Sequence, residues 1–265
     1  MVNRPSLRRL YVDREGGIRE KRETMRSFWT ALKFLTAFPW PRKLSPTAQE
    51  IGRSTPFFPL VGFGLGLILA LLNRILEPYL ESEILGVVLV VVLILATRAQ
   101  ELEALGESFD TIRSGAVREV TNKGGRRGQL GIFGILAVLV VVTLKFRAIE
   151  VMGEVRNQGL LLAPVFGRWS MVILAYGSKS EPGQAGRFVM EQVGGRHLLW
   201  ATILTLILAV LLADRLGLWI ALWVSLLPLV AGLYLHRRFG GLSGDNLRAV
   251  GEIAEAFAMV LFASL

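Results

Sequence analysis

The chain has 265 residues, of which 52% are hydrophobic and only 19% are charged, and its formal net charge is +9. An average soluble domain carries about 25% charged residues, so this composition, with a mean hydropathy of +0.50, indicates an integral membrane protein. The absence of cysteine excludes disulfides, thiolate metal sites and cysteine nucleophiles, and two histidines leave almost no material for a histidine-based metal site. A bound metal would therefore have oxygen ligands.

The N-terminal segment is basic, with twelve Lys and Arg against five Asp and Glu up to Arg53. Within it, residues 28–41 read FWTALKFLTAFPWP, an amphipathic patch that is too short to span a bilayer. This patch predicts an interfacial helix that ends near Pro39 and Pro41. We expect residues 1–53 to form a cytoplasmic segment in contact with anionic lipid, and residues 54–265 to form a single transmembrane helical domain.

Seven apolar segments follow, several of them long enough to cross a hydrocarbon core that needs about 20 residues. The glycines at positions 62, 64 and 66 are expected to allow close helix packing. The last segment is short, so it either spans, re-enters or packs inside the bundle. The predicted fold class is all-α, a polytopic membrane bundle of about six or seven transmembrane helices. The segments are Pro56 to Leu76, Ile84 to Ala96, Leu130 to Ile149, Leu160 to Tyr176, Leu198 to Ala213, Leu216 to Leu235, and Ile253 to the C-terminus.

The basic residues in the connections predict the orientation, because cytoplasmic loops carry the excess of Lys and Arg. Alternate connections, beginning with the N-terminal segment, hold 12, 6, 3 and 3 basic residues, whereas the opposite connections hold 0, 3 and 1. We therefore expect the N-terminus and every polar motif loop on the cytoplasmic side of the cell (inner) membrane. The net positive charge is interpreted as topology and lipid contact rather than as nucleic-acid binding.

Four carboxylates occur in the ten residues ELEALGESFD, directly after the second apolar segment. If this stretch continues the second helix beyond the membrane surface, Glu103, Glu107 and Asp110 share one face. Glu101 then points nearly the other way. Three like charges on one face repel unless a cation lies among them, and Mg²⁺ prefers carboxylate oxygens. The pattern indicates either a Mg²⁺ site or an ordinary solvated face balanced by nearby arginines.

A glycine-rich basic loop, TNKGGRRGQLG, covers residues 121–131 directly before an apolar segment. It could hold a phosphate through Lys123, Arg126, Arg127 and the following helix N-terminus. Equally, it could lie on anionic lipid.

A second glycine-rich stretch, RRFGGLSGDNLRAVGEIAE, precedes the last apolar segment. Its glycines, Gly244 among them, free the backbone to approach an anion, and Ser243 or Asp245 could cap a following helix. A plain glycine turn followed by an N-cap is the alternative interpretation.

Two basic residues lie within apolar segments. Arg168, in LAPVFGRWS, is an intramembrane charge, which indicates either a functional site or a helix-packing ion pair. Lys145 is expected near a helix end, where its side chain would reach the membrane interface.

In this order, the pieces resemble the cobalamin synthase family, the adenosylcobinamide-GDP ribazoletransferases, over most of the chain from about Phe28. ALKFLTAFPWP is similar to the family's ALxFLTRxPxP and FFPLVGFGLG to its FPLVGxxxG. GQLGIFGILAVLVVVTLKF resembles RxGxxGxxALxxxxxLKF, LAPVFGRWSMV resembles APxxxRWxMV, and GGLSGDNLRAVGEIAE resembles GGxTGDxxGAxxE. Five pieces in order, with matching spacing, make the resemblance fairly specific.

The acidic stretch is similar to the family's HLDGLADTAD, whose acids follow D-x-x-x-D-x-x-D. The corresponding residues here are Glu103, Glu107 and Asp110, so the spacing is kept and two aspartates have become glutamates. Other positions depart from the pattern. The chain has Glu101 at the family's histidine, Ala37 at the arginine of FLTR, Arg127 at an aspartate and Gln129 at an arginine. These departures indicate a divergent member of the family.

The resemblance implies a Mg²⁺-dependent condensation at the cytoplasmic face. The ribose hydroxyl of α-ribazole, or of its 5′-phosphate, attacks the diphosphate of adenosylcobinamide-GDP, and GMP leaves. Glu107 or Asp245 would accept the hydroxyl proton. The implied metal ligands are Glu103, Glu107, Asp110 and Asp245. The implied phosphate-binding residues are Lys123, Arg126, Arg168, Ser243 and Gly244.

Three alternatives are weighed against this interpretation. A CDP-alcohol phosphotransferase also binds metal and a nucleotide diphosphate with acidic residues at a membrane surface, but its D-x-x-D-G-x-x-A-R pattern is absent. A transporter would place its acids at the membrane midplane rather than at the edge. A diverged, non-catalytic membrane scaffold is the third alternative. Whatever the function, a homo-oligomer is compatible with the sequence.

Overall fold

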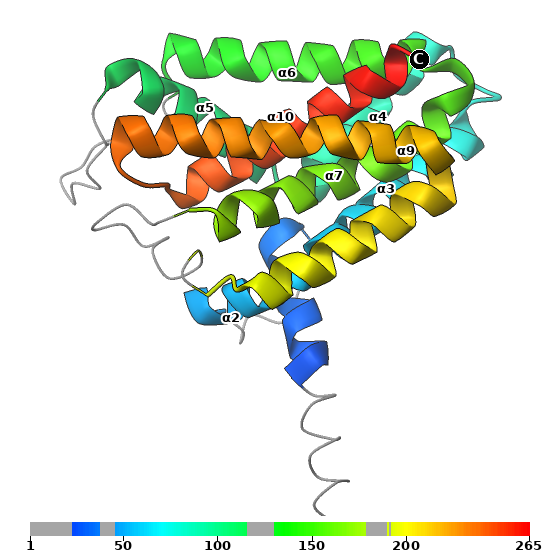
Figure 1. Ribbon diagram of the computed structural model, residues 1–265. Coiled ribbons are helices and arrows are strands. Elements are labelled where there is room, and N and C mark those ends of the chain that lie inside the picture. The colour runs from blue at the N-terminus through cyan, green and yellow to red at the C-terminus, as the bar shows by residue number, and fades with distance from the viewer. Residues whose placement is uncertain (1–22, 38–45, 116–129, 179–189, 191) are drawn as a thin grey trace, which may run out of the picture.

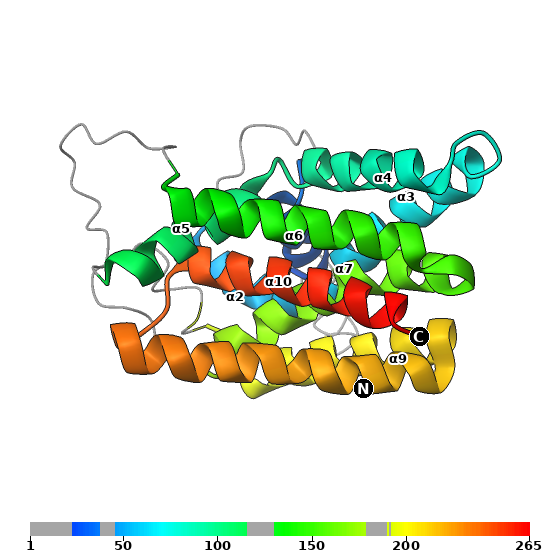
Figure 2. The same cartoon turned by 90° about the horizontal axis from the view of Figure 1, so that it is seen from above.

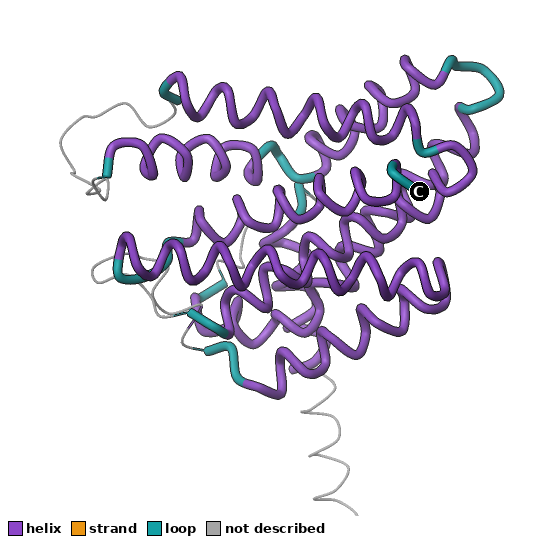
Figure 3. The backbone as a smooth tube through the Cα atoms, turned by 45° about the horizontal axis from the view of Figure 1, so that its top comes forward, coloured by secondary structure: helices purple, strands orange, loops and turns teal. Residues whose placement is uncertain are grey.

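The computed structural model describes residues 23–37, 46–115, 130–178, 190 and 192–265, and the regular elements in these ranges are helices (Figures 1 and 3). The all-α prediction is therefore confirmed. The helices are a first one over residues 23–35, then α2 (Ala48–Ser54), η1 (Thr55–Phe57), α3 (Phe58–Leu76), α4 (Ser82–Ala96), α5 (Gln100–Ser114), α6 (Ile132–Val151), η2 (Gly153–Val155), α7 (Arg156–Tyr176), α9 (Gly195–Phe239) and α10 (Gly244–Ala263).

Helix α7 lies at the centre of the bundle, in contact with α3, α9 and α10 (Figures 1 and 2). It is buried along nearly its whole length, whereas α6 and α9 leave rows of large apolar side chains exposed. Exposed apolar rows on long helices are the surface that faces lipid in a membrane protein. The layout therefore agrees with a membrane bundle built around one buried helix.

Four described helical stretches are long and apolar enough to cross a membrane: Ala48–Leu76, Ile132–Val151, Gly153–Tyr176 and Gly195–Phe239. A fifth would result if α4 and α5, which meet at an angle of 85°, were counted as one broken span. This count is close to the predicted six or seven, because the fourth stretch contains two of the predicted segments.

Helix α9 turns back on itself at Asp214. A straight helix of its 45 residues would be roughly 68 Å long, more than twice the hydrocarbon core. Asp214 interrupts it with φ 47° and ψ −130°, and Gly217 then packs directly on the backbone of Ala209. Figure 1 shows the two arms, yellow and orange, running back along the bundle. The fifth and sixth predicted segments are these two arms.

Close packing between α3 and α7 depends on two glycines. A methyl group at Gly62 or Gly66 would overlap the backbone of Pro164 or Leu161, respectively. Gly64 faces open space. The prediction of a glycine-mediated helix contact is thus confirmed at two of its three positions.

The last helix, α10, begins at Gly244, well before the predicted start at Ile253. A search for apolar runs misses this start, because four charged residues lie in the first twelve positions of the helix. Helix α10 does not qualify as a span, and it packs on α5, α6, α7 and α9. Of the predicted alternatives for this segment, packing inside the bundle is the one observed.

The predicted interfacial helix occurs as the helix over residues 23–35, so it starts earlier than expected. It docks on the bundle: Ala31 and Leu35 are buried, and the ring of Phe34 stacks on that of Phe58 with centroids 5.8 Å apart. Pro39 and Pro41, which were expected to end it, lie outside the described residues.

Candidate active site

The acidic stretch forms its own helix instead of continuing α4. Between α4 and α5, Arg98 and Ala99 have φ of 55° and 56°, a left-handed conformation that is costly for residues with a side chain. The N-terminal segment supports this turn: Ala37 N–H donates to the carbonyl of Ala96 at 2.6 Å, and Arg98 Nη2 donates to the carbonyl of Ala37 at 3.0 Å. The prediction of one continuous helix is wrong.

Within α5 the carboxylates separate by burial. Glu101 is only 5% exposed, whereas Glu103 is exposed and Glu107 and Asp110 are half-buried. The predicted helical phase, with Glu101 apart from the other three, therefore holds even though the helix starts anew.

Glu101 is bound by Arg168, which is 1% exposed in the middle of α7. Arg168 Nη2 donates to both carboxylate oxygens of Glu101, at 2.7 and 2.8 Å. Its Nη1 donates to Glu255 on α10. The ion-pair interpretation of Arg168 is thus the one observed, and both terminal nitrogens of its guanidinium are engaged.

Lys145 completes the buried network. Its ammonium lies 2.6 Å from Glu252 Oε1 and 2.7 Å from Glu255 Oε1, and the side chain is 2% exposed. The prediction that Lys145 reaches the membrane interface is wrong, because the residue lies well inside α6 and faces α10. We call these five residues the buried charge network: Glu101, Lys145, Arg168, Glu252 and Glu255.

A tight crossing of α7 and α10 allows this network to form. A methyl group at Gly167 would lie 2.9 Å from the carbonyl oxygen of Gly251, and one at Gly251 would lie 2.7 Å from Met171 Cγ. Because Gly167 and Gly251 have no side chains of their own, α7 and α10 approach closely, and Arg168 and Glu255 come into contact beside the crossing.

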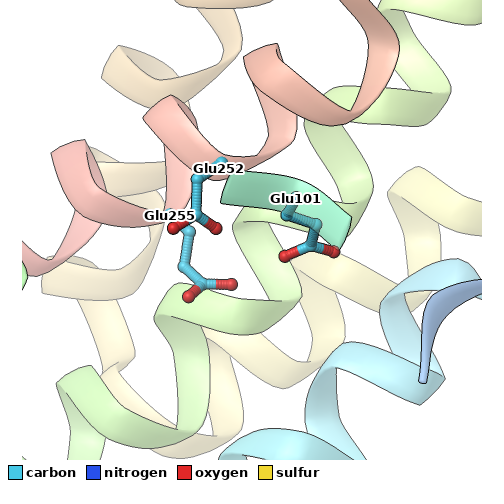
Figure 4. A group of neighbouring side chains, drawn as sticks. All are labelled: Glu101, Glu252 and Glu255. Carbon is cyan, nitrogen blue, oxygen red and sulfur yellow. The ribbon is translucent and has the colours of Figure 1, made fainter. Parts of the chain in front are cut away.

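The three glutamates of the network have carboxylate oxygens within 4.8 Å of one another (Figure 4). Such a group could hold a cation, but Lys145 and Arg168 already supply positive charge to it. Buried charges are tolerated when they are paired and hydrogen-bonded in this way. We therefore assign the cluster to the structure of the bundle and not to a metal.

Asp110 has a structural partner as well. Its carboxylate accepts hydrogen bonds from Gly131 N–H at 2.5 Å and Gly134 N–H at 2.9 Å, which are donors at the start of α6. An acid at this position complements the positive end of the helix.

Ser243 is the N-cap of α10. Its hydroxyl accepts from Asn246 N–H at 3.1 Å, and the Asn246 side chain accepts from Ser243 N–H at 3.0 Å. Asn246 Nδ2 also contacts Ser108 Oγ on α5 at 3.4 Å. The N-cap interpretation of this stretch is observed, and it ties the start of α10 to α5. Gly244 has open space where a side chain would be.

Asp245 lies in the first turn of α10, and its side chain is exposed in part and buried in part. Partial burial raises the pKa of its carboxyl above the ordinary value, Arg248 opposes that shift, and Glu103 adds to it. The charges of Asp245 on α10 and Glu103 on α5 therefore act on each other. Lys123, Arg126 and Arg127 lie outside the described residues.

A sequence profile of the cobalamin-5-phosphate synthase family matches residues 27–263. The chain belongs to this family.

Curated relatives of this cobalamin-5-phosphate synthase family member are named adenosylcobinamide-GDP ribazoletransferase. The protein of Syntrophobacter fumaroxidans is 36% identical over 245 residues, which cover 88% of this chain and 96% of the relative. That of Pseudomonas entomophila is 32% identical over 243 residues, covering 89% and 98%. That of Geotalea daltonii is 28% identical over 242 residues, covering 91% and 98%. No solved structure matches the chain.

In this cobalamin-5-phosphate synthase family member, the acids of α5 and α10 thus form two layers. The outer one holds Glu103, Glu107 and Asp245, and the inner one is the buried charge network. Sequence reasoning missed Glu252 and Glu255, because their partners lie far away in the chain, and it missed Arg248, whose place beside Asp245 follows only from the α10 start.

Proposed function

We propose that this chain is an adenosylcobinamide-GDP ribazoletransferase, which joins α-ribazole or its 5′-phosphate to adenosylcobinamide-GDP and releases GMP, a late step of cobalamin biosynthesis. The family match over residues 27–263 carries this conclusion. Relatives with this activity in their names are matched over 96 to 98% of their own length. The phosphotransferase, transporter and scaffold alternatives gain no support from these matches.

We place the reaction at the end of the bundle where α5 stops and α10 starts, on the left in Figure 1. Asp245 lies in the first turn of α10, and the start of α10 is held to α5 by the Ser108–Asn246 contact. Glu103 lies in the first turn of α5, and its charge acts on Asp245. Phosphoryl transfer depends on positioning and charge neutralisation more than on a covalent nucleophile. This end of the molecule offers oxygen ligands and exposed carboxylates for that purpose.

The outer acids fit a hard divalent cation. Glu103 and Asp245 are like charges that act on each other, and a cation between such groups relieves their repulsion. We propose that Mg²⁺ is held by Glu103, Glu107 and Asp245, with Asp110 as a fourth ligand that also caps α6. When bound, Mg²⁺ neutralises charge on the diphosphate.

The proton of the attacking hydroxyl passes to a carboxylate of this end. As the new bond from the ribose oxygen to phosphorus forms, the bond from that phosphorus to the GMP oxygen breaks. Of the two predicted acceptors, Asp245 is the better supported, because burial raises its pKa and a base works best with a pKa nearer to the working pH. Glu107 remains the second candidate.

The proposed function is tested with purified protein in detergent. We expect GMP release when adenosylcobinamide-GDP, α-ribazole 5′-phosphate and Mg²⁺ are added together, and none when either substrate is left out. A curated relative run in parallel shows that the assay works. Background levels of GMP from this chain beside an active relative would refute the proposal.

A further inference from the structure

Arg248 occupies an unusual position at the start of α10. It lies one helical turn after Asp245 on the same helix, and it is half-buried. The charges of Glu101, Asp245 and Glu103 all act on its guanidinium. Arg248 is thus a cation at the boundary between the buried charge network and the outer acids.

The hydrogen-bond donors of Arg248 are unused among the residues that the structure describes. There it forms no hydrogen bond and no ion pair within 4.0 Å, whereas Arg168 and Lys145 of the neighbouring network bind carboxylates directly. A guanidinium carries five N–H donors in a planar fork. A guanidinium whose N–H donors have no partner can bind an anionic ligand that the described residues do not supply.

The guanidinium of Arg248 lies over an aromatic ring. Arg248 Cζ lies 4.6 Å from the ring centroid of Phe34, which is within the range of a cation–π contact. Phe34 in turn stacks on Phe58, a fully buried residue of α3. The helix over residues 23–35 therefore holds the guanidinium of Arg248 beside Phe34, while no side chain of the described residues forms a hydrogen bond or ion pair with its nitrogens.

We propose that Arg248, held against Phe34, binds the diphosphate of the nucleotide-activated substrate. A planar guanidinium matches phosphate oxygens with two parallel hydrogen bonds. A negatively charged diphosphate among the outer acids needs positive charge from the protein as well as from a metal ion. Arg248 supplies it beside Phe34, whereas Arg168, one of the arginines for which the family resemblance implies this role, is engaged by Glu101 and Glu255.

This inference rests on the proposed function, because it names the contact of that function's substrate. The same chemistry would also suit the phosphate monoester of α-ribazole 5′-phosphate. If Arg248 binds the diphosphate, its substitution raises KM for adenosylcobinamide-GDP, and if it binds the monoester, its substitution raises KM for α-ribazole 5′-phosphate. Steady-state kinetics with each substrate varied in turn distinguishes the two.

The test compares Arg248→Gln, Arg248→Lys and Phe34→Leu with the wild type at saturating Mg²⁺. Loss of a two-point contact to a charged group should raise KM for adenosylcobinamide-GDP about tenfold to a hundredfold in Arg248→Gln. Lysine keeps the charge without the fork, so Arg248→Lys should fall in between. Phe34→Leu should raise this KM by a few-fold. In all three variants, KM for α-ribazole 5′-phosphate should stay within about twofold of the wild-type value.

The matched control is Arg238→Gln. Arg238 is an arginine at the same end of the bundle that also lies over a phenylalanine ring, with Cζ 5.7 Å from Phe239. It donates to the carbonyl of Ile112. Its removal should leave both Michaelis constants unchanged. Gel filtration and thermal unfolding verify that every variant is folded.

Three outcomes would overturn the inference. An unchanged KM for adenosylcobinamide-GDP in folded Arg248→Gln would make Arg248 a structural charge. A rise confined to α-ribazole 5′-phosphate would assign the contact to the other substrate. An equal rise of KM for adenosylcobinamide-GDP in Arg238→Gln would show that the effect comes from the positive charge of the protein surface and not from a specific contact of Arg248.

Direct binding separates this inference from the proposed function. Calorimetry with GDP and Mg²⁺, using protein in lipid nanodiscs, requires no turnover. If the wild type binds GDP and Arg248→Gln binds it at least about tenfold more weakly, the subsite stands even when no GMP is released from the full reaction. Equal binding by the two proteins would refute the subsite.

Discussion

Arg168 Nη2 binds both carboxylate oxygens of Glu101, 67 residues earlier in the chain, at 2.7 and 2.8 Å. Both side chains are buried, and Arg168 reaches Glu255 on its other side. One arginine of the central helix therefore joins the start of α5 to the middle of α10. Since α5 and α10 carry the outer acids, the relative position of those acids depends on this contact.

Removing Arg168 should be strongly destabilising. Arg168→Leu leaves the buried carboxylate of Glu101 without its partner and leaves Glu255 with Lys145 alone, and breaking a buried pair costs about 3–5 kcal/mol. We expect a much lower midpoint of thermal unfolding in detergent. Glu101→Gln keeps one hydrogen bond to Arg168, so its loss should be smaller, about 1–3 kcal/mol. If Glu101 were only an acid that points away from the other three acids of α5, Glu101→Gln would have no effect. A midpoint of thermal unfolding equal to that of the wild type in this variant would contradict the role of the buried charge network.

Lys145 and Arg147 provide a matched pair on α6. Lys145 is buried between two glutamates, whereas Arg147 forms an exposed ion pair with Glu150. Lys145→Met should lower stability by about 3–5 kcal/mol, and Arg147→Met by less than about 1 kcal/mol. Denaturant titrations of both variants measure the difference. Similar losses in the two would show that burial of Lys145 is unimportant.

The long apolar helices could be predicted from sequence because their runs are nearly uninterrupted. The predicted segment from Leu160 ends at Tyr176, where α7 ends, and the segment from Pro56 ends with α3 at Leu76. The start of α10 was hidden by its charged residues, whose burial depends on partners in other helices. The break before α5 was hidden because Arg98 and Ala99 are not residues that usually adopt positive φ.

The candidate site was predictable only in part, because many of its contacts join residues that are far apart in the chain. The spacing within α5 separates Glu101 from the other acids, because helical phase is a local property. The partners of Glu255 come from other helices: Arg168 is 87 residues away and Lys145 is 110 residues away. A single sequence carries no record of such pairs. Arg168 could thus be recognised as a costly intramembrane charge, but not matched with its partners.

The outer acids should control activity without controlling stability. Glu103→Gln, Glu107→Gln and Asp245→Asn should each lower kcat by about a hundredfold or more, because each removes a metal ligand or the proton acceptor. Asp110→Asn should lower activity too, with an added loss of stability from the weakened cap on α6. GMP release over a Mg²⁺ titration measures the effect.

The control for these variants is Glu83→Gln, an exposed acid in the first turn of α4. It should leave both kcat and the Mg²⁺ dependence unchanged. If Glu107→Gln were as active as Glu83→Gln, the acids of α5 would not share a metal.

The pH dependence should report Asp245. Its ordinary pKa is 3.8, and partial burial raises it, so the proton stays on this carboxyl up to a higher pH than on a free aspartate. Both proposed roles need the ionised form, and activity should therefore fall on acidification at a pH above that ordinary value. Arg248 lowers this pKa and Glu103 raises it. The acid limb should move to higher pH in Arg248→Gln and to lower pH in Glu103→Gln. Shifts of the opposite sign in pH–rate profiles would exclude Asp245.

The orientation can be tested cleanly because the chain contains no cysteine. Ser114→Cys lies at the end of α5, beside the proposed site, and Tyr79→Cys lies between α3 and α4, where the native side chain is 81% exposed. If the basic connections are cytoplasmic, a membrane-impermeant maleimide should label position 79 in intact spheroplasts, and position 114 only in inside-out vesicles. The reverse pattern would place the proposed site on the outer face, where a cytoplasmic nucleotide substrate could not reach it. Labelling of both positions in detergent verifies that each thiol is reactive.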